Sequence, residues 1–250
     1  MVKSKGKVLL TGGYLILDGY SGIVVNVNSY FDTNITQTTS QCSEKSIITV
    51  DSSEFTDCYQ EYLYSKNKIT CKNPNVFIQN TLLATLSFID RVLNVSIGNL
   101  DILIHSSQDF YSQEGKKSNF IPKTKKLSDI KKTGLGSSCC LVVSLVASLL
   151  NHFKLLKSDS DQLYSSSLSL VFNLAFFIHS FSQGCVGSGF DIYCAVYGSC
   201  IYKRVPCCFD NLFGAITAGH DGVFFNDSTS VEDFVEFAKK GYVVRNYTLF

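Results

Sequence analysis

A glycine-rich turn directly before an apolar helix is the strongest local sign of chemistry in this sequence. Gly134 and Gly136 let the backbone approach an anion closely, and the helix expected to begin near Ser137 offers unpaired N–H groups and the positive end of its dipole. Ser137 and Ser138 add hydroxyl oxygens, which suit a phosphate or Mg2+. The turn lacks the spacing of a Walker A loop. An isolated turn of this kind is equally typical of an ordinary helix start with Ser137 as its N-cap, so other segments have to decide.

Two charged residues stand in glycine-containing segments. Lys7 lies at the start of a short predicted strand that ends before Gly12 and Gly13, and Asp191 ends the run Gly-Ser-Gly-Phe-Asp. A fixed ammonium group can stabilise the negative charge of a reacting phosphoryl group. Taken singly, Lys7 would be a solvent-facing strand lysine and Asp191 a carboxylate near a helix start.

Several other polar residues have a structural interpretation beside a functional one. Tyr14 lies on a short predicted strand, where an aromatic side chain usually belongs to the core. His179 stands among phenylalanines on a predicted helix, which favours a hydrogen-bonded core histidine over a catalytic one. The thiols of Cys139 and Cys140 are expected to be small core groups rather than nucleophiles.

Composition excludes several classes of protein. The chain has 250 residues, 45% of them hydrophobic and 17% charged, so it can form a sizeable core. A net charge of +1 gives no broad cationic field for nucleic acid, and the apolar stretches are shorter than a membrane span. The ten cysteines show no zinc-ligand spacing, and no secretory signal is found, which favours reduced thiols and a cytoplasmic location. Peroxisomal association and the oligomeric state stay open.

Hydrophobic periodicity predicts strands early in the chain and helices later. Strands are expected at residues 8–10, 14–17, 23–35, 47–50, 58–64, 100–104 and 199–205. Helices are expected at residues 75–94, 137–152 and 162–181, with another running from 187–189 toward 197. This order lacks the regular alternation of a Rossmann fold and favours an α+β fold.

A polar loop at residues 106–132 precedes the glycine turn. It contains seven lysines, at positions 116, 117, 123, 125, 126, 131 and 132. Such charge runs are usually solvated, but this placement favours a position beside phosphate.

Three ordered segments together resemble the GHMP kinase superfamily, and within it the eukaryotic-type phosphomevalonate kinase family. They are Gly6-Lys7-Val8-Leu9-Leu10-Thr11-Gly12-Gly13-Tyr14, the turn at 132–138, and Gln183-Gly184-Cys185-Val186-Gly187-Ser188-Gly189-Phe190-Asp191. The match extends over residues 5–204. The resemblance implies an α+β fold with a mixed or antiparallel sheet backed by helices.

The resemblance also implies an activity: phosphoryl transfer from MgATP to 5-phosphomevalonate, giving 5-diphosphomevalonate and ADP in isoprenoid and sterol biosynthesis. Lys7 and Asp191 match the family's catalytic positions, Tyr14 and Ser188 would contact the acceptor, and Ser138 would ligate Mg2+. The implied ATP-binding residues are Lys132, Thr133, Gly134, Leu135, Gly136, Ser137 and Ser138.

The sequence departs from the family pattern in places. Lys5 and Lys131 stand where prolines are usual, and Cys185 replaces a common lysine. Residues 1–205 are expected to form the ATP-binding domain. Residues 206–250 stay unassigned, as a tail or the start of an incomplete C-terminal region, because they lack a third glycine-rich motif. Two alternatives therefore stay open: a truncated, non-catalytic nucleotide-binding module, or a related kinase with another small acceptor.

Overall fold

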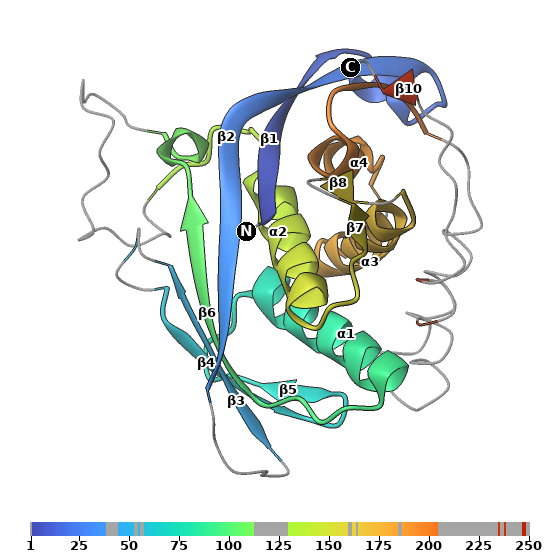
Figure 1. Cartoon of the computed structure of the whole chain (residues 1–250). Helices are drawn as coiled ribbons and strands as arrows, with labels where there is room; N and C mark the ends of the chain where they lie inside the picture. Colours follow the sequence, from blue (N-terminus) through green and yellow to red (C-terminus); the bar gives the residue numbers. More distant parts are fainter. Residues whose placement is uncertain are drawn as a thin grey trace.

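The chain folds into one large sheet covered on one face by helices, as the computed structural model shows (Figure 1). The structure describes residues 2–38, 45–52, 55, 58–112, 130–159, 162–163, 165–184, 187–204, 235, 238 and 247–248. Within these residues the predicted α+β class is confirmed.

The sheet has eight strands in the described residues, in the order β10-β9-β2-β6-β3-β4-β5 with β1 added against β2. The strand bounds are β1 Val2–Thr11, β2 Ser21–Thr38, β3 Ser46–Ser52, β4 Gln60–Ser65, β5 Lys68–Thr70, β6 Asn99–Ser106, β9 Cys200–Lys203 and β10 Tyr247–Thr248. Neighbouring strands run antiparallel, except for the parallel pair β3–β6. A separate small sheet pairs β7 (Ser158–Asp159) with β8 (Gln162–Leu163). The long β2 holds the large sheet together because it pairs with β1, β6 and β9.

The pairing of β1 with β2 is interrupted beside Lys7. Lys5 pairs with Tyr30 but Lys7 pairs with Asn26, so β2 contributes extra residues between the two pairs. Such bulges bend a strand and redirect its side chains. Among the described residues β1 pairs with β2 alone, so its second edge is left to meet other parts of the fold.

Four helices cover the sheet in the described part of the chain: α1 (Val76–Leu93), α2 (Ser137–His152), α3 (Ser165–Ser182) and α4 (Phe190–Tyr197). The same part also has two short 3-10 helices, η1 (Gly13–Ile16) and η2 (Gln108–Phe110). By length and composition α1 and α3 could each cross a membrane. Both helices pack against α2 and against each other, and core helices pass the same test, so this is weak support for a span.

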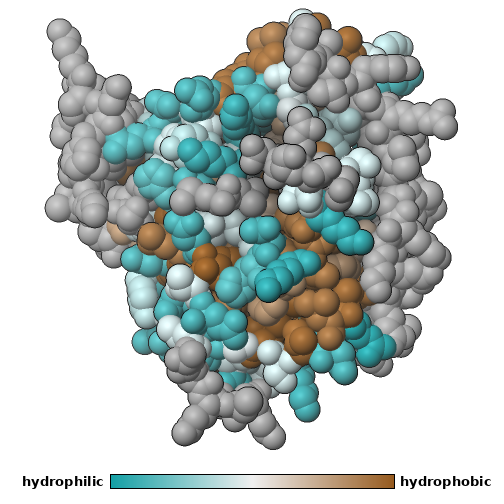
Figure 2. Space-filling model, in the orientation of Figure 1, coloured by the Kyte–Doolittle hydropathy of each residue, from teal (hydrophilic) through white to brown (hydrophobic). Residues whose placement is uncertain are grey.

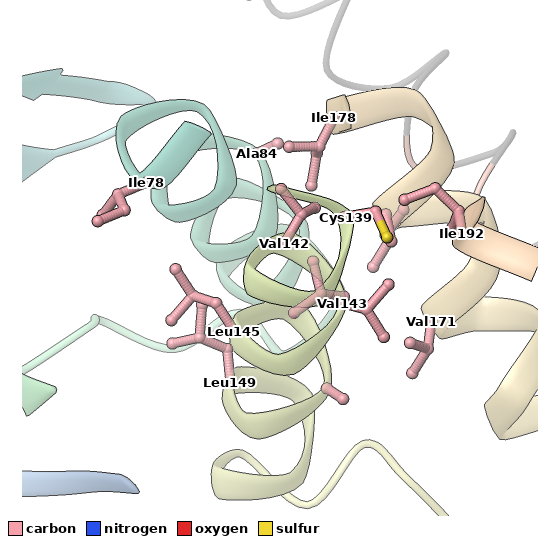
Figure 3. Packing of buried hydrophobic residues seen from close by; sticks show 14 of the residues in the cluster. Ile78, Ala84, Cys139, Val142, Val143, Leu145, Leu149, Val171, Ile178 and Ile192 are labelled. Atoms are coloured by element: carbon pink, nitrogen blue, oxygen red, sulfur yellow. The ribbon is translucent and has the colours of Figure 1, made fainter. Parts of the chain in front are cut away.

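Helix α2 lies at the centre of the core, between the sheet and the other helices (Figure 3). Its Val142 lies beside Ala84 of α1, and its Val143 points toward Val171 of α3. These side chains are nearly or fully buried. On the sheet side, Ser144 Oγ lies 2.8 Å from Thr33 Oγ1 of β2, which ties the helix to the longest strand. Helix α2 is therefore held from several sides.

A side-chain cap fixes the start of α1. Asn75 accepts hydrogen bonds from the backbone N–H groups of Phe77 (3.0 Å) and Ile78 (3.4 Å). We expect Asn75→Ala to lower the free energy of unfolding by about 1 kcal/mol, since two N–H groups lose their partner. Urea denaturation followed by circular dichroism measures the change. Unaltered stability would show that water replaces the cap at no cost.

Most predicted elements are confirmed, with two corrections. The helix predicted at 137–152 is observed with the same bounds, and the strand at 23–35 and the helix at 75–94 lie within a residue or three of theirs. The strand predicted at 14–17 is wrong: η1 occupies this segment, because Gly12 and Gly13 adopt positive φ angles of 111° and 41° and turn the chain. Helix α3 begins at Ser165 rather than 162, after the short strand β8.

Some predictions fall on residues outside the described part. Five of the seven lysines of the polar loop, and Cys185, belong to this group. The division of the chain at residue 205 stays a prediction. Three points beyond it are described: Val235 and Ala238 are buried, and β10 pairs with β9.

Candidate active site

The glycine turn and strand β1 meet directly. The backbone N–H of Lys7 donates to the Leu135 carbonyl at 3.0 Å, across the strand edge that β2 does not use. The thiol of Cys140 also donates to the Lys5 carbonyl at 3.2 Å, so the first turn of α2 covers the same edge. Backbone contacts therefore fix Lys7 beside the turn.

Gly136 is required at its position for two reasons. Its φ of 79° lies in the left-handed region, which side chains disfavour. A Cβ atom there would also lie 2.9 Å from Lys7 Cε and 3.2 Å from Cys139 Sγ. The Lys7 side chain thus passes closely over the turn. Gly134 has a similar φ of 83°, but a Cβ there would meet nothing within 4 Å.

Helix α2 begins without a side-chain cap from the described residues. Its N-cap is Gly136, which has no side chain that could bond the N–H groups of the first turn. The interpretation of Ser137 as an ordinary N-cap is therefore wrong: Ser137 is the first helical residue and is only 8% exposed. An uncapped helix start with a positive dipole end is suited to an anion.

The residues before the turn are anchored to η2. Thr133 donates its N–H to the Phe110 carbonyl (3.0 Å) and its hydroxyl to the Asp109 carbonyl (2.7 Å). Lys132 forms an isolated antiparallel bridge with Tyr111 and keeps an exposed side chain. Thr133 thus holds the turn in place, whereas Lys132 lines the same cavity as Ser137 and Ser138.

A second element brings Asp191 to the same region. Helix α4 packs against β1 and α2, and Asp191 lies in its first turn. The Lys7 ammonium lies 5.0 Å from the centre of the Phe190 ring, next to Asp191 in the chain. Gly189, with φ 79°, permits this turn, since a Cβ would come 2.7 Å from the Phe176 ring. Ser188 accepts a hydrogen bond from the Tyr202 hydroxyl through its carbonyl.

A buried histidine completes the cluster. His179 of α3 is 4% exposed, and its Nε2 lies 3.1 Å from Ser138 Oγ. Burial lowers the pKa of His179, while Asp191 raises it and Lys7 lowers it. The expectation of a buried, hydrogen-bonded histidine is confirmed. Its hydrogen-bond partner is Ser138, the candidate Mg2+ ligand. No spacing in the sequence indicates this pair, because α2 and α3 meet only in the folded chain.

An aromatic cavity of about 70 Å3 opens beside the turn. Its polar lining includes Lys132, Ser137 and Ser138, and its aromatic lining comes from Phe31, Phe55, Phe77 and Tyr111. These rings lie far apart in the sequence, so no local pattern indicates the cavity.

Tyr14, a candidate acceptor contact, is exposed, unlike the residues of the cluster. Tyr14 is 88% exposed on η1, so among the described residues nothing encloses it. Other exposed apolar side chains surround it in the sequence: Leu10, Leu15, Leu17 and Tyr20. Hydrophobic atoms gather at the upper edge of Figure 2, where β1 and β2 curve over the molecule.

The thiols of Cys139 and Cys140 are fully buried. The hydrogen bond with Cys140 and burial raise the pKa of Cys139. Both thiols are core groups, as expected.

Curated proteins with similar sequences are named phosphomevalonate kinases, although no protein-family profile matches the chain. The phosphomevalonate kinase of Gibberella zeae is 38% identical, over 81% of this chain and 51% of its own length. That of Candida albicans is 31% identical, over 83% of this chain and 49% of its own length. The chain is a phosphomevalonate kinase homologue. It spans about half the length of these relatives.

A solved structure agrees on the fold of this phosphomevalonate kinase homologue. The Streptococcus pneumoniae phosphomevalonate kinase in complex with phosphomevalonate and AMPPNP superimposes with a TM-score of 0.57. The match has 22% identity and covers 92% of this chain and 55% of that protein. It confirms the expected GHMP kinase fold.

The oxygen donors of this phosphomevalonate kinase homologue fit Mg2+. Among the described residues no group of three or more His, Cys, Asp or Glu side chains could hold a metal. Mg2+ in kinase sites keeps several waters and is bound by one or two carboxylates together with substrate phosphates, and in P-loop proteins by a Ser or Thr hydroxyl as well. Ser138 Oγ, placed at the uncapped start of α2, would supply one hydroxyl ligand.

Proposed function

We propose that this chain binds MgATP at the turn before α2 and carries out phosphoryl transfer to 5-phosphomevalonate, giving 5-diphosphomevalonate and ADP. One observation carries the proposal: the hydrogen bond from Lys7 to Leu135 joins an ammonium-bearing strand to an uncapped helix start. The two features that a triphosphate needs, backbone donors and a fixed cation, thereby share one place.

Each residue group has a role in this proposal. The N–H groups of the turn and of the first turn of α2 bind the phosphates, and Ser137 and Ser138 add hydroxyl contacts. Lys132 contributes a positive charge at the rim of the cavity that Ser137 and Ser138 also line. Lys7 stabilises the negative charge that spreads over the transferred group. Bound at Ser138 and the nucleotide, Mg2+ would supply further neutralisation of phosphate charge.

The acceptor requires no strong base in this proposal. A phosphate acceptor is already ionised, so proton removal contributes less than it does for an alcohol. Asp191 orients the acceptor or the ammonium of Lys7, and Ser188 lies three residues before it. Tyr14 is proposed as an acceptor contact, although η1 leaves it exposed. The acceptor itself is proposed from the names of the relatives.

The proposed location is the cytoplasm. None of the described cysteines forms a disulfide, in keeping with a reducing compartment. An Arabidopsis thaliana relative is named a peroxisomal phosphomevalonate kinase, so peroxisomal association belongs to the proposal as an alternative.

A second candidate function is a nucleotide-binding module without transferase activity. It is motivated by residues 206–250, which lack a third glycine-rich motif. It predicts ATP-induced thermal stabilisation of the chain but no product with any acceptor.

One assay separates the two functions. The purified chain is supplied with MgATP and, in parallel, with mevalonate, 5-phosphomevalonate or galactose, and ADP release is measured. We expect ADP only with 5-phosphomevalonate, and none when EDTA removes the divalent metal. ADP release with another acceptor would show that 5-phosphomevalonate is not the substrate. Thermal stabilisation by ATP without ADP release would establish the second function.

A further inference from the structure

The hydrogen bond between Ser138 and His179 joins the start of α2 to the last part of α3. Ser138 Oγ and His179 Nε2 are 3.1 Å apart, although 41 residues separate them in the chain. The imidazole also packs against the Phe77 ring of α1, with ring centres 5.5 Å apart. Three helices therefore fix the position of this ring.

Burial restricts what else the imidazole can do. His179 is 4% exposed, so bulk water hardly reaches it. Ser138 is half-buried and lines the cavity at the turn. Ser138 rather than His179 therefore faces an incoming ligand, and His179 acts through Ser138.

The direction of the hydrogen bond matters for a metal ligand. A serine hydroxyl has one proton and two lone pairs, and a neutral imidazole has one accepting nitrogen. When Ser138 donates its proton to His179 Nε2, both lone pairs of Oγ stay free and the proton points away from a cation. When Nε2 donates instead, one lone pair is consumed and the hydroxyl proton needs another acceptor. The first arrangement suits Mg2+.

We propose that His179 is a positioning residue that accepts a hydrogen bond from the Ser138 hydroxyl through Nε2 and so presents the lone pairs of Ser138 Oγ to the magnesium of MgATP. The inference rests on the proposed function, because it takes Ser138 as the point where the chain meets MgATP. Groups that orient a metal ligand in this way commonly change metal affinity when they are replaced.

The test measures nucleotide binding rather than turnover. Isothermal titration calorimetry gives the Kd of ATP with Mg2+ and with EDTA for the 250-residue chain and its variants. His179→Leu removes the acceptor, and His179→Gln supplies an amide oxygen near the place of Nε2. Ser138→Ala removes the donor. The Mg2+-dependent gain in affinity is the ratio of the Kd with EDTA to the Kd with Mg2+. We expect this ratio to be about 10- to 100-fold smaller in His179→Leu and in Ser138→Ala than in the unaltered chain.

Two further variants separate positioning from simple stability. Asn80 of α1 donates to Ser182 Oγ of α3 at 3.0 Å, a partly buried hydrogen bond between two core helices that involves neither Ser138 nor His179. Asn80→Ala should lower the melting temperature and keep the Mg2+-dependent gain. His179→Gln should also keep most of that gain, and the double variant Ser138→Ala/His179→Leu should lose no more than either single one.

The outcomes are decisive in each case. Equal losses in His179→Leu with Mg2+ and with EDTA, or no loss, would overturn the inference while leaving ATP binding, and the proposed function, standing. Failure of the unaltered chain to bind ATP would overturn both. If His179→Leu does not fold, the gain must vanish in Ser138→Ala and persist in His179→Gln; any other combination overturns the inference.

Discussion

Replacing Lys7 with methionine is expected to lower the rate of phosphoryl transfer by about 100- to 1,000-fold, the range found when one fixed charge-stabilising group is removed. Methionine keeps the apolar stem that passes over Gly136 and removes only the ammonium group. The backbone bond from Lys7 to Leu135 does not depend on the side chain, so the fold should persist. ADP release at saturating 5-phosphomevalonate measures the effect.

Lys3 supplies a matched control on the same strand. Its ammonium lies 4.2 Å from the centre of the Tyr30 ring, an aromatic contact like that of Lys7 with Phe190, but its side chain is exposed. Lys3→Met should leave transfer unchanged. Equal rates for Lys7→Met and Lys3→Met would show that the Lys7 ammonium group does not contribute to phosphoryl transfer.

Replacing Gly136 with alanine is expected to affect both stability and transfer. The left-handed conformation costs a side chain about 1–2 kcal/mol, and the new methyl group displaces Lys7 Cε, which lies 2.9 Å from the Cβ position. A displacement of about 1 Å can reduce a rate by about 100-fold. We therefore expect a lower free energy of unfolding in urea, and transfer reduced by about that factor.

Gly134 separates the two effects of the Gly136 substitution. Its φ is similarly positive, but a methyl group added there would meet no atom within 4 Å. Gly134→Ala should show the same cost in unfolding free energy with a smaller loss of transfer. Equal losses of transfer in the two variants would mean that backbone conformation, rather than the position of Lys7, limits the reaction.

Local patterns in the sequence were sufficient for the helices that build this site. The apolar run after Gly136 predicted α2 with its observed bounds, because a buried helix is apolar over most of its surface. The glycines at 134 and 136 predicted the turn, since both adopt the left-handed backbone that glycine allows. Segment 14–17 was misread as a strand because its apolar residues fit a short strand as well as a 3-10 turn.

By itself the sequence determined the turn and the helix after it, since each depends on residues that are neighbours in the chain. It also determined the family resemblance, which depends on the residue types and the order of three separate motifs. Tertiary structure alone decided that Lys7 bonds to Leu135, that Ser138 meets His179, and that four aromatic rings gather beside the turn. The partners in both hydrogen bonds lie on different elements, far apart in the chain. Such meetings depend on how strands and helices pack, and packing brings together surfaces whose spacing in the chain carries no period.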